Sequence, residues 1–367
     1  MSLKSAFFRE WRKIIPERKK YSENEYMFTS AKIAAMSAGL MGRDRLLSLT
    51  DETDAEAVTE RLKEFGYGTS GDKEISEDTG GEIGASVDAE KLLTDKLSAV
   101  YGEITEFCPD KELLDLIRLR YDCHNVKTAV KCGYLGVDPA PYMIDCGSIS
   151  AEKVAETAKD RGKDGWDFLP PKSAAAAKKA SEELDASGSA RTVDALLDAA
   201  CFADMLDYAA RVGFVPAERM LKVRVDTTNI MSVMRIMRIK NPDLAAALTE
   251  DSIYEGGNIP VELLKTAESP ADLAELAAGA GYTLLEKTLK NSGTDTQTLE
   301  ITAAEADKEF LRKLREETEF HLLGAYQLMD YVVSLEYEIK NLRIILSGKQ
   351  FGMDPQTIRE RLRLSDV

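Results

Sequence analysis

Three six-residue stretches decide the fold of this chain: Tyr121-Asp122-Cys123-His124-Asn125-Val126, Val225-Asp226-Thr227-Thr228-Asn229-Ile230 and Tyr337-Glu338-Ile339-Lys340-Asn341-Leu342. They align without gaps as apolar, acid, x, x, Asn, apolar, and their acids lie 104 and 112 residues apart. Internal repetition of this kind indicates several copies of one structural unit.

The register of the three stretches extends along one helix face. Apolar residues stand eight and four positions before each Asn and four positions after it, namely Ile117, Leu221 and Val333, then Tyr121, Val225 and Tyr337, then Ala129, Val233 and Ile345. A period of about four is that of a helix face, so each Asn interrupts an apolar stripe on a predicted helix.

A second repeated element follows each predicted helix. A proline preceded by an acid or amide lies 14, 13 and 14 residues after the Asn, in Asp138-Pro139, Asn241-Pro242 and Asp354-Pro355. Such dipeptides end helices and open turns. A further similarity covers two copies only, Gly147-Ser-Ile149-Ser-Ala-Glu152 and Gly257-Asn-Ile259-Pro-Val-Glu262.

The rest of the chain also favours helices. Runs rich in Ala, Leu, Glu, Lys and Met cover 173–184, 192–211, 216–240, 261–278 and 303–347, and alternating β-branched runs are absent. We therefore predict an all-α fold of three pseudo-symmetric units, with loops at 66–86 and 162–171. The predicted division is a basic N-terminal extension 1–22, units at 23–140, 141–243 and 244–350, and a C-terminal helix or tail 351–367.

Each acid lies three residues before its Asn, so the two side chains are neighbours on the helix. One interpretation is a metal or acid/base site. The other is a buried pair that hydrogen-bonds to the end of a neighbouring helix, because buried polar groups must find partners. Three copies in one chain with little accessory chemistry favour the structural interpretation for these six residues: Asp122, Asn125, Asp226, Asn229, Glu338 and Asn341.

Composition narrows the possible functions. The chain has 367 residues, 44% of them hydrophobic, and a formal charge of −16. A nucleic-acid-binding protein needs an extended basic surface, which this chain lacks. No run of 18 apolar residues is present, so no membrane span is expected. Residues 51–90 carry 13 acids and 3 bases, a pattern typical of a solvated face.

The residues that usually carry chemistry are scarce. There are two histidines, His124 and His321, and five cysteines without C-x-x-C spacing, Cys108, Cys123, Cys132, Cys146 and Cys201. Neither a disulfide framework nor a zinc site is expected, and a reducing, cytoplasmic compartment is inferred. A phosphate-binding P-loop is absent. We predict no catalytic residues, no bound cofactor and no metal.

Over roughly residues 23–367 the sequence resembles the C/d family of V/A-type rotary ATPase subunits, in which C is the name of the ATP synthase member and d that of the eukaryotic one. Besides the three acid-x-x-Asn helices, Tyr26-Met-Phe-Thr-Ser30-Ala31-Lys32-Ile33-Ala-Ala-Met36 looks like the family's opening helix and Phe351-Gly-Met-Asp-Pro355 like its ending. Lys32 stands where the family often has Arg, and residues 1–22 extend beyond the usual start.

The resemblance implies a helical funnel with three-fold pseudo-symmetry. In the family, this funnel sits on the cytoplasmic side of the membrane rotor ring of proteolipid subunits and receives the shaft made by subunits D and F. The implied role is a non-catalytic rotor subunit, present in one copy per complex and monomeric when isolated. It would transmit torque between ATP turnover and the transport of protons or sodium ions.

Two other interpretations remain open. Stacked helical repeats also give internal similarity, so a generic helical repeat scaffold is an alternative, although such repeats usually recur every 20–50 residues. A metal-dependent hydrolase that uses the acid and Asn pairs is the other.

Overall fold

The structure is a computed structural model that describes residues 21–68, 82–158, 165–321 and 323–364. Within these ranges the chain forms helices and connecting segments, with no strand. The predicted all-α class is confirmed. Of the predicted N-terminal extension, residues 1–20 lie outside the described ranges.

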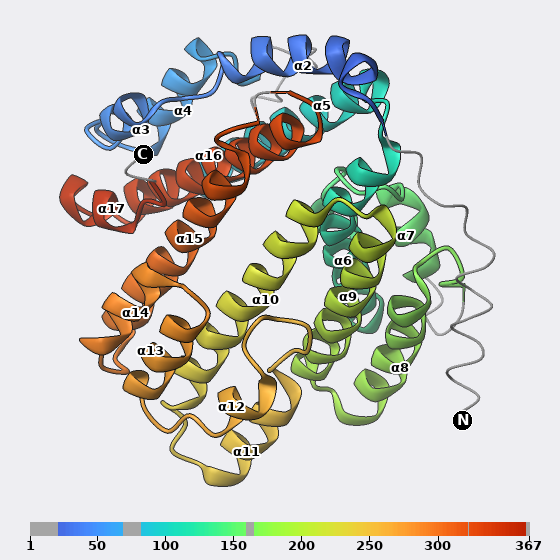
Figure 1. The fold of residues 1–367 in the computed structure, drawn as a ribbon, viewed down its shortest axis with the longest axis vertical. Coiled ribbons are helices and arrows are strands. Elements are labelled where there is room, and N and C mark those ends of the chain that lie inside the picture. Colours follow the sequence, from blue (N-terminus) through green and yellow to red (C-terminus); the bar gives the residue numbers. More distant parts are fainter. Residues whose placement is uncertain (1–20, 69–81, 159–164, 322, 365–367) are drawn as a thin grey trace.

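Figure 1 shows how the helices follow one another along the chain. Their bounds are α2 Glu23–Ser37, α3 Arg43–Leu49, α4 Ala55–Glu64, α5 Glu82–Phe107, α6 Lys111–Leu135, the 3-10 turn η1 Ala140–Tyr142, α7 Ala151–Ala158, α8 Pro171–Ser187, α9 Ala190–Val212, α10 Val215–Ile236, α11 Pro242–Asp251, α12 Val261–Lys265, α13 Pro270–Gly279, α14 Thr283–Lys290, α15 Thr296–Thr318, α16 Ala325–Gln350 and α17 Pro355–Arg361.

The three repeated stretches lie on α6, α10 and α16, which we call the signature helices. Each packs against another long helix: α6 against α9, α10 against α15, and α16 against α5. Helix α16 also packs against α2, α3, α4 and α17. The beginning and the end of the described chain therefore lie side by side, at the top of Figure 1.

The repeated acid or amide before proline has a local role. Asn241 accepts hydrogen bonds from the backbone N–H groups of Asp243 and Leu244, and so caps α11. Asp354 caps α17 in the same way. Proline fits the first helical position because no helical acceptor is available to an N–H there. The dipeptides thus follow the end of one helix and start another short one.

Three predicted segments differ in detail from the structure. The end of the predicted 66–86 loop is helical, because α5 begins at Glu82. The run 261–278 is divided at Pro270, where Ser269 forms a capping box with Asp272 and starts α13. The run 303–347 is divided between α15 and α16. Gly324, the residue before α16, has a φ of 76°. Composition alone did not reveal these breaks.

Two apolar clusters form the core of the described residues. The larger joins the N-terminal helices with α10 and α12–α17 and with parts of α6 and α9. The smaller lies where the second half of α6 meets α7–α9 and includes Val126, Ala129 and Trp166. None of the helices built by the described residues is long and apolar enough to cross a membrane.

The structure corrects the expectation about cysteines. Cys123 on α6 and Cys201 on α9 form a disulfide across 78 residues of sequence. Cys108, Cys132 and Cys146 are buried and take no part in a disulfide. The prediction of no disulfide was wrong, because sequence spacing cannot reveal that two distant cysteines lie on the facing sides of two packed helices.

Candidate structural site: three acid and asparagine clamps

The three signature asparagines make one and the same contact. The side-chain amide of Asn125 donates to the carbonyl of Ile144 at 2.9 Å and accepts from the N–H of Ile144 at 2.9 Å. Asn229 binds both backbone groups of Tyr254 at 2.8 Å. Asn341 binds those of Arg363 at 3.3 and 2.6 Å.

All three asparagines are buried, with exposed fractions of 0%, 0% and 2%. An amide offers a donor and an acceptor side by side, which matches the N–H and C=O of one backbone residue. A carboxylate would lack the donor. This pairing explains why the apolar stripe is interrupted by Asn, and it ties each signature helix to the segment that follows it.

The signature acids hold a second point of backbone. Asp122 accepts from the N–H groups of Ser148 and Ile149 at 3.2 and 3.0 Å. Asp226 accepts from those of Asn258 and Ile259 at 2.8 and 3.1 Å. In both cases the bound segment leads directly into a short helix, α7 or α12.

These contacts explain the glycines of the two-copy similarity. A Cβ atom added at Gly147 would lie 2.1 Å from Oδ1 of Asp122, and one at Gly257 would lie 1.9 Å from Oδ1 of Asp226. Only glycine lets the backbone approach the carboxylate this closely.

The third acid finds its partner at the other end of the chain. Glu338 accepts from the N–H of Met41, just before α3, and from the hydroxyl of Tyr67 at 2.6 Å. The Gly39-Leu40-Met41 segment therefore takes the place of Gly147-Ser148-Ile149 and Gly257-Asn258-Ile259. Sequence reasoning missed this copy because it precedes, rather than follows, its signature helix.

A hydroxyl group completes each acid site. Tyr282 donates to Oδ2 of Asp226 at 2.5 Å, as Tyr67 does to Glu338, and both tyrosines follow a glycine with positive φ, Gly281 and Gly66. In the first site the hydroxyl comes from Ser148 at 2.7 Å. The recurring Gly-Tyr dipeptide was the signal available in the sequence.

The chemistry of these carboxyl groups is that of buried acceptors. Burial raises the pKa of Asp122, Asp226 and Glu338, and the hydrogen bonds that they accept oppose this rise. Among the described residues no group of three or more His, Cys, Asp or Glu is placed to hold a metal ion. His124 lies apart, with Nε2 3.3 Å from the carbonyl of Tyr142.

We expect Asn229→Ala to lower the free energy of unfolding by about 1–3 kcal/mol, because it leaves both backbone groups of Tyr254 without partners. Asn229→Asp should cost a similar amount, since a carboxylate cannot donate to the Tyr254 carbonyl. Urea denaturation measures both. Asn291→Ala, at an exposed position, is the control and should change little. If Asn229→Ala and the control were equally stable, the claim that the contact between Asn229 and Tyr254 stabilises the protein would be contradicted.

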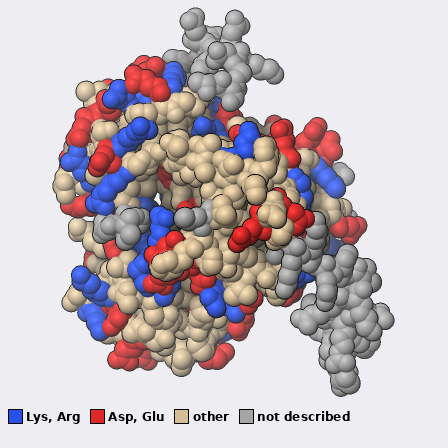
Figure 2. Space-filling model, turned by 45° about the horizontal axis from the view of Figure 1, so that its top comes forward, with Lys and Arg blue, Asp and Glu red and all other residues tan. Residues whose placement is uncertain are grey.

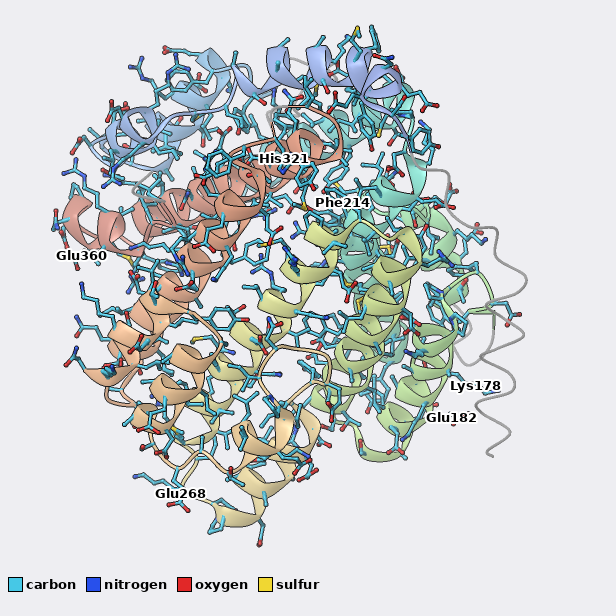
Figure 3. The ribbon with its side chains drawn as sticks, in the orientation of Figure 1. Lys178, Glu182, Phe214, Glu268, His321 and Glu360 are labelled. Carbon is cyan, nitrogen blue, oxygen red and sulfur yellow. A yellow bond between two sulfur atoms is a disulfide. The ribbon has the colours of Figure 1, made fainter. Side chains whose placement is uncertain are left out.

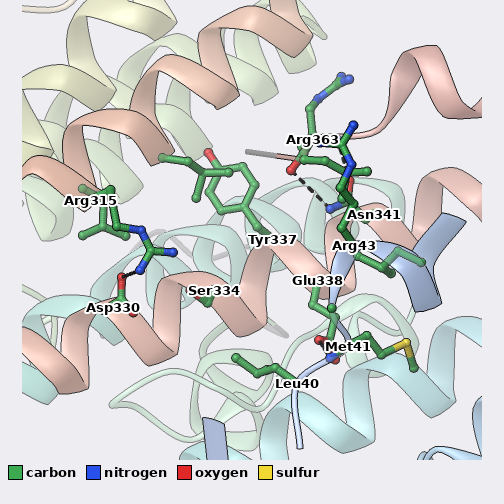
Figure 4. A pocket seen from close by; sticks show the side chains of 15 residues that line it. Leu40, Met41, Arg43, Arg315, Asp330, Ser334, Tyr337, Glu338, Asn341 and Arg363 are labelled. Atoms are coloured by element: carbon green, nitrogen blue, oxygen red, sulfur yellow. Dashed lines mark hydrogen bonds and ion pairs between the residues drawn. The ribbon is translucent and has the colours of Figure 1, made fainter. Parts of the chain in front are cut away.

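A charged network surrounds the third clamp. Asp307 on α15 accepts from Lys340 at 2.5 Å, from Tyr337 at 2.8 Å and from Arg363 at 2.9 Å. Arg224 of α10 lies 3.5 Å from the same carboxylate. The network therefore joins α10, α15, α16 and the C-terminal segment. Tyr337, Asn341 and Arg363 are among the residues that line a pocket of about 280 Å³ (Figure 4).

We expect the stability supplied by Asp307 to depend on pH. Burial raises its pKa, but the charges of Lys340 and Arg224 outweigh burial and hold the pKa of Asp307 below its ordinary value. A depressed pKa contributes stability above the unfolded value, and this is lost as pH falls through the folded value. Asp307→Asn should therefore cost about 1.5–3 kcal/mol near neutral pH, and the difference from wild type should shrink below about pH 4. Urea titrations at several pH values measure this, and a difference that grows on acidification would contradict it.

A helical body whose recurring polar groups hold its own backbone is typical of a structural subunit. The chain belongs to the ATP synthase (C/AC39) subunit family, which it matches over residues 29–361. It is therefore a non-catalytic subunit of a rotary ATPase or ATP synthase.

Proteins similar to this chain have names that are consistent with this family. The C subunit of the A-type ATP synthase of Methanocaldococcus jannaschii is 24% identical over 357 residues, covering 92% of this chain and 86% of that protein. The corresponding A-type ATP synthase protein of Methanosarcina acetivorans is 22% identical, covering 94% and 95%. The C subunit of the V-type sodium ATPase of Enterococcus hirae is 21% identical, covering 76% and 83%.

Proposed function

We propose that the chain is the central-stalk adaptor of its complex, which joins the shaft of subunits D and F to the membrane ring of proteolipid subunits. In this role it transmits the torque that couples ATP turnover to the transport of protons or sodium ions. It would lie on the cytoplasmic face of the membrane, attached through the ring, as one copy that is monomeric when isolated.

The observation that carries this proposal is the recurrence of one buried clamp on three long helices, within a family of rotary ATPase subunits. A body that transmits rotation must resist deformation, and two-point attachment of each connecting segment to a helix provides this. The side chains of Asn125, Asn229 and Asn341 bind backbone inside the molecule. They are therefore not part of the outer surface, where partners would bind.

We also propose boundaries for the three units, chosen from the packing contacts between helices. The predicted units 23–140, 141–243 and 244–350 remain a prediction. As an alternative we propose units that each begin at a signature helix: 111–214, 215–324, and 325–364 together with the described residues of 21–110. Each signature helix then lies in one unit with the long helix that it packs against, α9, α15 or α5. The third unit is completed by the beginning of the chain, which closes the proposed funnel.

Removal of the chain from the complex tests the role. We expect the head to hydrolyse ATP and the membrane sector to keep its ring, while ATP-driven ion transport into vesicles is lost and returns when purified chain is added back. A complex without the chain that pumps ions at the normal rate would refute the adaptor role.

A further inference from the structure

An apolar patch lies where helix α2 meets the beginnings of α10 and α16. Ser30 of α2 accepts from the N–H of Gly324 at 2.9 Å, which holds the start of α16 beside α2. The rings of Phe214 and His321 both pack on Tyr326, with centroids 4.9 and 3.9 Å away, and Phe214 and His321 lie near each other in Figure 3. These contacts bring together three segments that are distant in the sequence.

Large apolar side chains of these segments are exposed. Their exposed fractions are 84% for Phe320, 64% for Met27, 52% for Leu323 and 51% for Val215. We call these four residues the end patch. Exposed apolar side chains that gather in one place usually mark an interaction site. A segment that covered them would remove apolar surface from water and so stabilise the protein.

The sequence that leads into α2 has a matching apolar pattern. Between residues 3 and 15, large apolar residues recur at intervals of one, three and four, as Leu3, Phe7, Phe8, Trp11, Ile14 and Ile15. This is the spacing of one face of an amphipathic helix. Pro16 follows, at a position where such a helix would end.

The charge of the same segment is opposite to that of the rest of the chain. Residues 1–20 hold seven basic and two acidic side chains, a formal charge of +5 out of a total of −16, so the remaining residues carry −21. On the face in Figure 2, acidic and basic side chains are interspersed with uncharged areas.

Acids prevail around the end patch. Helix α2 also reaches the start of α6, where Tyr26 donates to Asp110 at 2.9 Å. Eight acidic and four basic residues lie in the segments that meet here, 23–32, 107–112, 211–219 and 316–326. A segment that offers both basic and apolar side chains is therefore complementary to this part of the surface.

Two buried oxygen atoms at the same end lack donors. No hydrogen-bond partner is found among the described residues for Oε2 of Glu112, in the first turn of α6, or for Oε1 of Gln327, in the first turn of α16. Buried polar atoms without partners are rare in folded proteins. Both atoms are acceptors, and lysine and arginine side chains are suitable donors for them.

The covalent connection keeps the segment close to the end patch. Tyr21, the first described residue, packs edge to face on Tyr26, with ring centroids 6.1 Å apart. Met27 is the next residue along α2. Residues 16–20 span at most about 17 Å when extended, and thirteen helical residues span about 20 Å. Residues 3–15 are therefore within reach of the end patch, and their effective concentration there is on the order of millimolar.

We propose that residues 3–15 bind the end patch of the same chain through their apolar face. In this arrangement the apolar face contacts Phe320, Leu323 and Met27, and the basic residues lie near the surrounding acids. The segment thereby keeps apolar surface out of water while the chain is free, and it opposes self-association. This inference goes beyond the proposed function, because it concerns the free chain and does not depend on which partners the chain has.

Hydrogen exchange of the full-length chain, followed by mass spectrometry, tests the proposal. In the wild type, the backbone amides of residues 3–15 should exchange at least about tenfold more slowly than those of a synthetic peptide of residues 1–20. The double variant Phe320→Ser with Leu323→Ser removes apolar area without changing the charge, and it should lower this protection at least about tenfold.

The matched control is Phe351→Ser, which should keep the protection of residues 3–15. Its phenylalanine is 73% exposed and lies at the C-terminal end of α16, roughly 40 Å along this helix from the end patch. Thermal unfolding of all variants should stay cooperative, which shows that a loss of protection does not result from unfolding.

Four results would overturn the proposal. The first is exchange of residues 3–15 in the wild type as fast as in the peptide. The second is protection that survives in the double variant, and the third is an equal loss of protection in the control. The fourth is protection that appears only when vesicles of phosphatidylcholine and phosphatidylglycerol are added, since the segment would then bind anionic lipid instead of the end patch.

Discussion

Replacement of Gly257 by valine is expected to destabilise the protein by about 3 kcal/mol or more. The new Cβ would lie 1.9 Å from Oδ1 and 2.8 Å from Cγ of Asp226. The carboxylate can avoid this clash only by giving up its hydrogen bonds to the N–H groups of Asn258 and Ile259. Those buried groups would then lack an acceptor, which adds to the cost of the clash.

Gly279→Ala is the matched control, since a Cβ at this position in α13 meets nothing within 4 Å. Alanine should be neutral or slightly stabilising there, by at most about 1 kcal/mol. Urea denaturation of the three proteins measures both effects. If Gly257→Val unfolded at the same urea concentration as wild type, the close approach of backbone and carboxylate would be refuted.

Loss of the Cys123–Cys201 disulfide is expected to lower the free energy of unfolding by about 2–4 kcal/mol. The bond closes a segment of 78 residues between α6 and α9, so it restricts the unfolded chain. The double replacement Cys123→Ser and Cys201→Ser should have this effect. Reduction of the wild type by dithiothreitol should lower its stability to the level of the double variant.

Cys132→Ser is the control for this experiment, because Cys132 is buried and free. Its stability should fall by the same amount as that of wild type when the reductant is added. Mass spectrometry of the alkylated, unreduced protein should detect a peptide pair linked through Cys123 and Cys201. Absence of that pair, with no response of stability to reductant, would refute the bond.

The sequence predicted the helical class because helix periodicity is a local property. The stripe around each Asn, with apolar residues four positions before and after it, needs only one turn of helix on either side to be visible. The same is true of Asn241 and Asp354, whose capping partners lie two to three residues away. Local hydrogen bonds leave a local pattern.

The backbone segments that the signature acids bind were harder to predict from the sequence. Gly147 and Gly257 stood out as a repeated pattern because both must be glycine beside a short Asp side chain. In the third copy Glu338 has one more methylene group, and a Cβ at Gly39 would meet only the carbonyl of Met36, at 3.2 Å. The glycine there is not required by the carboxylate, so the pattern is weaker.

The disulfide and the ring contact between Phe214 and Tyr326 depend on contacts between distant segments. The pairing of Cys123 with Cys201 requires the relative rotation of α6 and α9 about their axes. The meeting of Phe214 with Tyr326 requires the orientation of α10 against α16. Neither is encoded in the spacing of residues, since both result from how complete helices pack.

The position of the third clamp has a consequence for folding during synthesis. Met41 and Tyr67 are 297 and 271 residues from Glu338 in the chain, yet they are its partners. The N-terminal helices leave the ribosome first, but their packing surface on α16 is made almost last. Contacts so distant in sequence form slowly, and large chains fold through intermediates that expose apolar surface. The nascent chain must therefore hold α2–α5 incompletely buried until α16 emerges, and chaperones would be needed most during that interval.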